Sequence, residues 1–337
     1  MRVLGIETSC DECAASVVVD GRRIESNVIA SQISIMQPYD GVVPELASRK
    51  HIEWIARVVR EALSEASVSV DDIDGVAATA RPGLSGSLLV GFSFAKAFAL
   101  ARRVPFAAVD HILAHLYAPQ LETEIKYPYL GLLVSGGHTL IAVVRDHDVV
   151  EVLGTTIDDA AGEAFDKVSK HLGLGYPGGV AIDQIARTGD PTAFAFPDPS
   201  LHKGDHPYDV SYSGLKTAVI NQLDRFWNGT SERTPANIAA SFQRAAVNML
   251  VRRVVRAASD TGLGTVVVGG GVAANSYLRA RLLEEESVSA YFPDRVLCTD
   301  NAAMIAGVGY RYLQAGREAG WTETVSARVH SFRRTYP

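Results

Sequence analysis

The sequence predicts an α/β fold with two similar lobes. Short β-branched runs alternate with segments of helical periodicity along the whole chain, which is the pattern of α/β domains. Two meanders of three strands, one at the start and one near residue 129, are each followed by helices and further strands. We expect an N-terminal lobe over residues 1–110, completed by a C-terminal helix at about 302–337, and a C-terminal lobe over 111–301.

The first cycle of elements begins with a hairpin. Strands at 3–6 and 14–19 flank a polar turn, and 24–31 supplies the third strand. Helical periodicity predicts a helix over 51–67, with Ile52, Ile55, Val59 and Leu63 on one face. The remaining expected elements are strands at 76–79 and 106–109 and helices at 85–102 and 112–117.

The second cycle repeats this order. Its expected strands are 129–134, 139–144, 149–153, 265–268 and 296–299, and its expected helices are 160–172, 180–187, 235–259, 275–286 and 302–315. The 235–259 helix has Pro235 at its first position, where the missing N–H costs nothing. Residues 191–209, rich in Pro, Asp and His, are expected to form a surface insertion or loop.

Composition limits the classes of function. The 337 residues carry a net charge of -6, which mildly disfavours a nucleic-acid-binding protein. Three cysteines are too few for a disulfide framework, and acids interrupt the N-terminus where a secretion signal would be apolar. The longest apolar stretch, 88–101, is too short to span a bilayer. We therefore expect a cytoplasmic protein that does not use a membrane.

Three turns at strand ends suggest a phosphate-binding site. They are residues 7–12, the Ser135-Gly136-Gly137-His138 turn after Val134, and Gly269-Gly270-Gly271. Glycine lets backbone N–H groups approach an anion closely. Two hairpin turns plus a strand-to-helix glycine turn match the layout of actin-like ATPases and sugar kinases, with a nucleotide cleft between the lobes. A P-loop and a GxGxxG fingerprint are both absent.

His111 and His115 are spaced to share one face of a helix and to ligate one metal ion. Surface or capping histidines are the alternative. Zinc proteases would have Glu after the first His, but Ile112 stands there. Asp300, between an apolar run and a helix, is a candidate third ligand with many rival carboxylates. Asp110 is expected to orient or cap the histidine helix.

The first turn contains further candidates. Cys10 and Cys13 form a CxxC, but no second cysteine pair exists, so we interpret it as a coincidence. Asp11 and Glu12 in the same turn are candidate catalytic bases, with a solvated turn as the alternative.

A second group of residues suits an adenosine. Asp166, in the Gly-Glu-Ala-Phe-Asp-Lys segment, and Asp183 are candidates to accept ribose hydroxyls, and Gly179 permits close approach. A helix cap and an ordinary loop explain the same residues equally well.

Several motifs together resemble the TsaD family, in its bacterial form. They are 5–11 (GIETSCD), 41–47 (GVVPELA), the His111/His115 pair, 134–139 (VSGGHT), 162–167 (GEAFDK), 213–217 (SGLKT), 269–275 (GGGVAAN) and 300–306 (DNAAMIA). They extend over almost the whole chain. Cys13, where the family usually has Thr, and Ala114, where Gly is common, are the departures.

The resemblance implies an actin-like fold. It implies transfer of a threonylcarbamoyl group from threonylcarbamoyl-AMP to N6 of adenosine 37 in tRNAs that read ANN codons. It assigns His111, His115 and Asp300 to one divalent metal ion, Fe²⁺ before Zn²⁺. It assigns the adenylate to nine residues, which are Val134, Ser135, Gly136, Gly137, His138, Asp166, Gly179, Asp183 and Asn275.

The resemblance also implies partners. These are tRNA, a TsaB-like paralogue, a TsaE-like ATPase and a TsaC-type synthase. With its negative charge, the chain alone is expected to bind tRNA weakly. The alternative functions are an actin-like small-molecule kinase, a metalloprotease, and a non-catalytic scaffold of the TsaB type.

Overall fold

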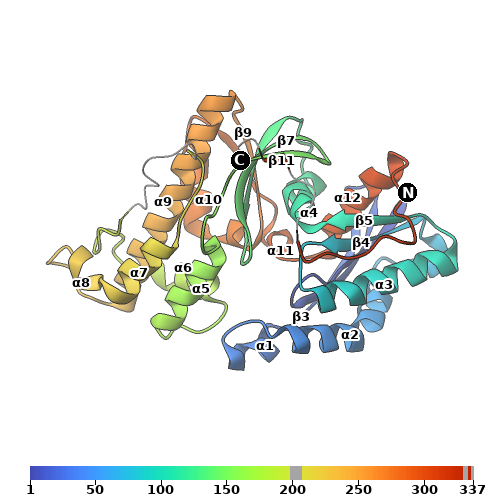
Figure 1. Ribbon diagram of the computed structural model, residues 1–337, viewed down its shortest axis with the longest axis horizontal. Coiled ribbons are helices and arrows are strands. Elements are labelled where there is room, and N and C mark those ends of the chain that lie inside the picture. The colour runs from blue at the N-terminus through green and yellow to red at the C-terminus, as the bar shows by residue number, and fades with distance from the viewer. Residues whose placement is uncertain (198–206, 329–332, 335–337) are drawn as a thin grey trace. The chain divides into compact units, whose positions relative to one another are not determined.

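The structure, a computed structural model, describes residues 1–197, 207–328 and 333–334 and comprises two compact units (Figure 1). The first unit consists of Met1–Lys126 and the segment that begins at Pro293, and the second begins at Tyr127 and ends its main segment at Phe292. Among the described residues, no helix combines the length and the apolar character that a membrane crossing requires.

The first unit is built on a five-stranded sheet in the order β3-β2-β1-β4-β5. Its strands are β1 (Arg2–Glu7), β2 (Glu12–Val19), β3 (Arg23–Ser31), β4 (Gly75–Arg81) and β5 (Phe106–Asp110). The β1–β2–β3 meander is antiparallel, whereas β4 and β5 run parallel to β1. The predicted meander and both predicted later strands are confirmed. Because β1, β4 and β5 are parallel, their carboxyl ends meet at one edge of the sheet.

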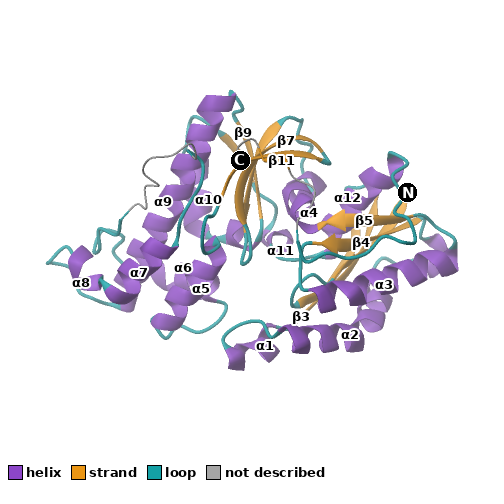
Figure 2. Cartoon of the chain, viewed as in Figure 1, coloured by secondary structure: helices purple, strands orange, loops and turns teal. Residues whose placement is uncertain are grey.

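Helices cover both faces of this sheet (Figure 2). Ile6 belongs to the core that packs under α2 (Pro44–Glu65) and α3 (Ser85–Arg102). Gly5 points to the opposite face, where a Cβ would lie 2.2 Å from the carbonyl oxygen of Ala302 in α12 (Ala302–Gln314). Alternate residues of a strand face opposite sides of the sheet. Glycine at position 5 therefore lets the start of α12 approach β1 directly.

Residues 111–126 belong to the first unit, whereas the sequence predicted a lobe boundary after residue 110. The reason is the packing of α4 (His111–Tyr117) on α12. Arg311 donates from Nε to the Tyr117 hydroxyl at 3.1 Å, and a Cβ on Gly307 would lie 2.6 Å from the same ring. The α4 helix is thus fixed to α12 before the chain leaves the unit.

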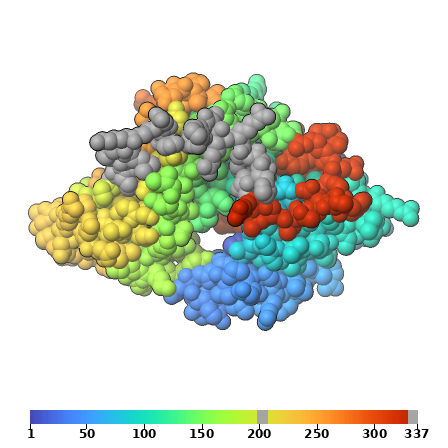
Figure 3. Space-filling model, in the orientation of Figure 1, coloured from blue at the N-terminus to red at the C-terminus, as the bar shows by residue number. Residues whose placement is uncertain are grey.

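Helix α2 differs from its prediction in two ways. It begins at Pro44 rather than at residue 51, with proline in its first turn. Ile52 was expected on the buried face, but it is 66% exposed, while Ile55, Val59 and Leu63 are buried as predicted. His51 takes the buried position instead. In Figure 3 the blue N-terminal atoms, which include α1 and α2, lie on the visible surface.

Residues 296–299 form no strand. The structure has a short helix there, α11 (Arg295–Cys298), which begins directly after Asp294. Three consecutive apolar residues suit a strand and a buried helical turn equally, so periodicity alone could not separate them. The minor elements of the first unit are α1 (Ile33–Met36), η1 (Gln37–Tyr39), η2 (Val70–Asp72) and η3 (Ala118–Leu121).

The second unit has a six-stranded sheet in the order β10-β9-β6-β7-β8-β11. Its strands are β6 (Tyr129–Val134), β7 (Thr139–Asp146), β8 (Val149–Thr155), β9 (Thr265–Gly269), β10 (Ser289–Tyr291) and β11 (Arg333–Arg334). The β6–β7–β8 meander is antiparallel and β9 runs parallel to β6, so the first sheet's arrangement is repeated. The short strands β10 and β11 were not predicted.

The helices of the second unit follow the predicted order, with two added α-helices and one added 3-10 helix, η4. They are α5 (Ala161–His171), α6 (Gly178–Ala186), α7 (Ser213–Asn221), α8 (Leu223–Phe226), α9 (Pro235–Thr261), η4 (Gly271–Ala274) and α10 (Ser276–Leu283). Helices α7 and α8 were not predicted. Of the expected loop at 191–209, residues 191–197 and 207–209 lack helix and strand, and 198–206 lie outside the described residues.

Candidate functional site

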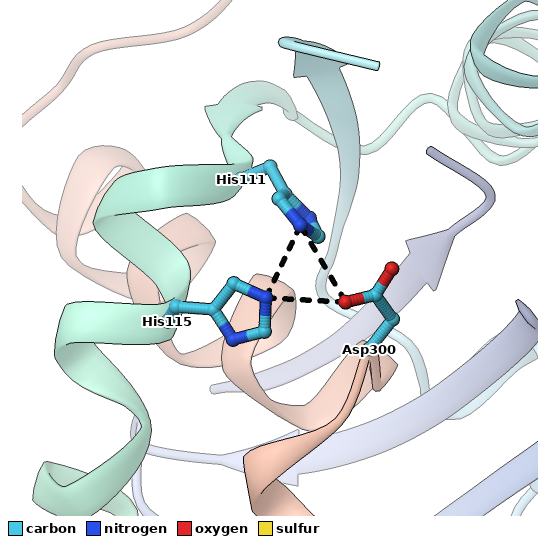
Figure 4. A group of neighbouring side chains, drawn as sticks. All are labelled: His111, His115 and Asp300. Atoms are coloured by element: carbon cyan, nitrogen blue, oxygen red, sulfur yellow. Dashed lines mark hydrogen bonds and ion pairs between the residues drawn. The ribbon is translucent and has the colours of Figure 1, made fainter. Parts of the chain in front are cut away.

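Three side chains of the first unit converge on one point, as Figure 4 shows. His115 Nε2 lies 3.1 Å from His111 Nε2 and 3.1 Å from Asp300 Oδ1. The third edge, from His111 Nε2 to Asp300 Oδ1, measures 3.5 Å. Both histidines are buried, whereas the Asp300 side chain keeps 19% of its exposure. The structure therefore brings together the three residues that the sequence proposed as metal ligands.

Capping interactions at two helix ends fix this arrangement. Asp110 is the N-cap of α4, and its Oδ1 accepts from the backbone N–H groups of Ile112 and Leu113 at 2.9 and 3.3 Å. Such a cap stabilises a helix by about 0.5–2 kcal/mol. Asn301 caps α12 in the same way, accepting from the Met304 N–H at 3.1 Å. The caps hold the adjacent residues, His111 and Asp300, at the ends of their helices.

The electrostatics of the group favour a shared cation. Burial would lower the pKa of His111, but the carboxylates of Asp300 and Glu7 outweigh it and raise that pKa to about 9. The pKa of His115 is lowered, first by burial and then by the charge of His111. Two imidazole nitrogens that face each other at 3.1 Å cannot both be neutral acceptors without a proton or a cation between them.

The donor set fits a divalent metal ion. Two Nε2 atoms and one carboxylate oxygen lie within 4.8 Å of one another. Two histidines and one carboxylate are a common ligand set for zinc and for non-haem Fe²⁺. The neighbouring position that would carry the base of a zinc protease is Ile112, which is only 1% exposed. The metal-site chemistry is therefore supported and the protease alternative is not.

Glu7 is a site residue that sequence reasoning missed. It ends β1, is fully buried, and its Oε2 lies 3.1 Å from His111 Nδ1. Its other partners are the Thr79 hydroxyl and the Ser9 backbone N–H. The signal that could have found Glu7 is the order of the strands. Because β1, β4 and β5 run parallel, Glu7, Thr79 and Asp110 lie at or near the carboxyl ends of these strands, at one edge of the sheet.

The turn with Asp11 and Glu12 is held by residues distant in sequence. His51 donates from Nε2 to the Cys10 carbonyl oxygen at 2.9 Å, and the Gln32 N–H donates to the Asp11 carbonyl at 3.0 Å. Asp11 is 7% exposed. Burial and the charges of Asp11 and Asp300 raise the pKa of Glu12 well above its usual value. Asp300 thus acts electrostatically on this turn, although the catalytic roles of Asp11 and Glu12 stay a prediction.

Neither cysteine of the CxxC has the features of a reactive or metal-binding thiol. Cys13 is fully buried in the core of the first unit, and both thiols are free. Burial raises the pKa of Cys10 and raises that of Cys13 to about 12. Thiols of this kind are poor nucleophiles and poor metal ligands, in agreement with the interpretation as a coincidence.

The predicted phosphate turn of the second unit is a closed hairpin. The Ser135 N–H donates to the His138 carbonyl at 2.8 Å, and the His138 N–H donates to the Ser135 hydroxyl at 3.0 Å. Apart from the adjacent residues of the chain, no residue that the structure describes has an atom within 4 Å of the place where a Cβ would stand on Gly136 or Gly137. Packing does not require glycine there, whereas close approach of a ligand to the backbone would.

Helix α5 begins against this hairpin. The Gly162 N–H donates to the Ser135 carbonyl at 3.1 Å, and a Cβ on Gly162 would lie 2.8 Å from the Gly136 Cα. On the other side of the turn, Gly270 has φ +92° and a Cβ there would lie 2.4 Å from the Val134 carbonyl oxygen. These two glycines therefore allow the hairpin, α5 and the end of β9 to pack closely.

The remaining adenylate candidates connect adjacent helices. Asp166 Oδ1 accepts from the Gly178 N–H at 2.7 Å, and Asp183 Oδ1 accepts from the Ser276 hydroxyl at 2.7 Å. Asn275 caps α10 through Leu278 N–H and donates to Gln243 Oε1 at 2.8 Å. Gly179 has open space around its Cβ position. These contacts link α5, α6 and α10, and their roles in ligand binding stay predictions.

Comparisons with known proteins agree with the motifs. Residues 23–307 match the family TsaD, described as tRNA N6-adenosine threonylcarbamoyltransferase. The chain belongs to the TsaD family. A relative of that name from Treponema denticola is 60% identical over 332 residues, covering 98% of each chain. A relative of the same name from Borrelia garinii subsp. bavariensis is 48% identical, covering 100% of this chain and 99% of its own. The bacterial TsaD resemblance is confirmed.

Solved structures with low sequence identity confirm the fold. Full-length HypF superposes with a TM-score of 0.62 at 16% identity, over 94% of this chain and 56% of HypF. Component A of the (R)-2-hydroxyglutaryl-CoA dehydratase of Acidaminococcus fermentans gives 0.58 at 16% identity, over 93% of this chain and 99% of its own. The TsaD chain has the predicted actin-like α/β fold, and a central nucleotide cleft stays a prediction.

Proposed function

We propose that this chain transfers a threonylcarbamoyl group from threonylcarbamoyl-AMP to N6 of adenosine 37 in tRNAs that read ANN codons, with release of AMP. The observation that carries the proposal is the triad of His111, His115 and Asp300 in a chain that matches a TsaD relative over 98% of that relative's length. A TsaB-type scaffold of the same fold would have no use for such a triad.

His111 and His115 bind one divalent metal ion through Nε2, and Asp300 binds it through Oδ1. Fe²⁺ is the metal we favour, because two histidines and one carboxylate form its usual facial set, and Zn²⁺ is the alternative. When bound, the metal supplies a Lewis acid that stabilises negative charge on an oxygen of the donor. The burial of both histidines keeps water from competing for their lone pairs.

Residues of the second unit bind the adenylate. The N–H groups of Gly136 and Gly137 offer donors to phosphate oxygens, helped by the positive end of α5. Asp166 and Asp183 accept ribose hydroxyls, because an ionised carboxylate is a pure acceptor with about four lone-pair sites. Gly179 and Asn275 are the remaining residues that we propose for adenylate binding. AMP held in this way is a good leaving group in a fixed position.

An acid of the first turn removes a proton from the attacking amine. The exocyclic amine of adenine is a weak nucleophile, so positioning and proton removal supply much of the rate. The raised pKa of Glu12 makes its carboxylate a stronger base once ionised. Asp11 lies beside it in a turn that His51 and Gln32 hold rigid. Both residues remain candidates for this role.

The chain acts within an assembly. We propose as partners a TsaB-like paralogue, a TsaE-like ATPase and a TsaC-type synthase that supplies the adenylate. The net charge of -6 gives the isolated chain little general attraction to tRNA phosphates. Much of the tRNA-binding surface therefore belongs to the assembly, and the reaction takes place in the cytoplasm.

Reconstitution tests the proposal. The purified chain is incubated with threonine, bicarbonate, ATP, tRNA and the partner proteins, and the tRNA is digested for nucleoside analysis. The expected product is threonylcarbamoyl-adenosine, which is absent when the chain is omitted. No modified adenosine, with partners that are active alongside another TsaD protein, would contradict the proposal.

A further inference from the structure

Glu7 has an unusual environment for an acidic side chain. It lies at the end of β1 with 0% exposure, in the same unit as the metal triad. A carboxylate this deeply buried is costly unless hydrogen bonds and a nearby positive charge compensate it. The partners of the Glu7 carboxylate therefore indicate its role.

Both carboxylate oxygens of Glu7 accept hydrogen bonds, which fix their positions. Oε1 accepts from the Ser9 backbone N–H and Oε2 accepts from the Thr79 hydroxyl, each at 2.5 Å. Oε2 also lies 3.1 Å from Nδ1 of His111. The first two donors are neutral, so His111 is the partner among these three that can connect Glu7 to a positive charge.

The geometry distinguishes the two ring nitrogens of His111. Its Nε2 lies 3.1 Å from His115 Nε2 and 3.5 Å from Asp300 Oδ1, whereas its Nδ1 faces Glu7. A neutral imidazole that ligates through Nε2 carries its proton on Nδ1, where it needs an acceptor. The Ser9 hydroxyl is also near Nδ1, at 3.3 Å, but a carboxylate is the stronger and closer acceptor.

We infer that Glu7 is a positioning residue, which accepts the Nδ1 proton of His111 and thereby fixes Nε2 as the metal-ligating atom. This inference rests on the proposed metal site. Glu7 sets the ring orientation and makes His111 a stronger donor. It does not touch the metal. Thr79 and Ser9 hold Glu7 in turn, so the ends of β1 and β4 support the ligand that follows β5.

A substitution tests the effect on metal affinity. Glu7→Gln keeps the side-chain size and removes the charge, and Zn²⁺ affinity is measured by competition with a chelator of known affinity. We expect affinity to fall about 10–100-fold, the usual cost of losing such an outer partner. Glu25→Gln is the matched control, because Glu25 pairs with Arg2 and Arg23 on the same sheet. Its Zn²⁺ affinity should stay within twofold of the unsubstituted chain.

A second measurement needs no variant and separates positioning from a purely structural role. Nitrogen-15 NMR of the histidine-labelled, Zn²⁺-loaded chain, with a His111→Gln sample for assignment, reports which ring nitrogen of His111 carries the proton. We expect a protonated Nδ1 in a strong hydrogen bond and a metal-bound Nε2. A role of Glu7 limited to joining β1 and β4 would not predict this signature.

The outcomes are distinct. Unchanged Zn²⁺ affinity in folded Glu7→Gln, or ligation of His111 through Nδ1, overturns the role of Glu7 and leaves the proposed function intact. Should Glu7→Gln fail to fold, the NMR signature decides alone. An unsubstituted chain that binds neither Zn²⁺ nor Fe²⁺ overturns both the inference and the metal site of the proposed function.

Discussion

Asp300 Oδ1 lies 3.1 Å from Nε2 of His115, although the two residues are 185 positions apart in the chain. The contact arises because α4 and the start of α12 pack together, while a cap at each helix end fixes the adjacent ligand. This contact places Asp300 with His111 and His115 as the third candidate metal ligand, rather than as an isolated surface acid.

Asp300→Ala is therefore expected to remove the metal without unfolding the chain. Even the loss of an outer partner of a metal ligand lowers metal affinity about 10–100-fold, so the loss of a direct ligand should lower it more than about 100-fold. Metal content of the purified variant and its circular dichroism are the measurements. Stoichiometric metal in folded Asp300→Ala would remove Asp300 from the site.

Asp11→Ala is expected to lower the rate of transfer much more than adenylate binding. A positioned base contributes about 10²–10⁴-fold to a rate, whereas the adenylate candidates lie in the other unit. Single-turnover transfer and adenylate affinity are measured side by side. Equal losses in both would assign Asp11 to binding instead.

Gly162→Ala is expected to disturb the Ser135–His138 turn and its contact with α5. The new Cβ would lie 2.8 Å from the Gly136 Cα, so the hairpin and α5 must separate. Overpacking of this kind costs about 1–3 kcal/mol of stability, and AMP affinity should fall at least about fivefold. Gly264→Ala is the control, since its nearest neighbour would be 3.9 Å away. Equal AMP affinity in both variants would argue against the turn as the phosphate site.

The raised pKa of Cys13 predicts that the free energy of unfolding falls at alkaline pH. Burial raises its pKa from 9.0 to about 12 in the folded chain, so the unfolded chain releases the thiol proton first. Stability from this group is complete below pH 9 and falls by about 1.4 kcal/mol per pH unit between 9 and 12. Urea unfolding from pH 8 to 11 measures it. Cys13→Ala should show a shallower decline, and an identical decline would refute the assignment.

The sequence proposed much of the candidate site, because several signals were local. The spacing of His111 and His115 was enough to propose that they bind one metal ion. Asp110 beside them was correctly expected to cap their helix. Asp300 was one carboxylate among many, because it reaches the histidines through the packing of α12 on α4 and on β1, which Gly5 permits.

Other features were invisible to local patterns. Glu7 ends a strand whose neighbours in the sheet, β4 and β5, follow much later in the chain, so its contact with His111 depends on the sheet order. The run at 296–298 was too short to separate strand from helix. Ile52 was placed on the wrong face because the helix begins earlier, at Pro44, and buries His51.

Single-turnover transfer from isolated threonylcarbamoyl-AMP to tRNA tests the central claim most directly. It bypasses the synthase, so the chain is the only component that varies between samples with the same partners. We predict that the metal-loaded chain forms threonylcarbamoyl-adenosine and that His115→Ala, folded but free of metal, forms at most about 1% as much in the same time, in line with the loss of direct metal catalysis. Equal product from His115→Ala, or none from the metal-loaded chain, would contradict the account.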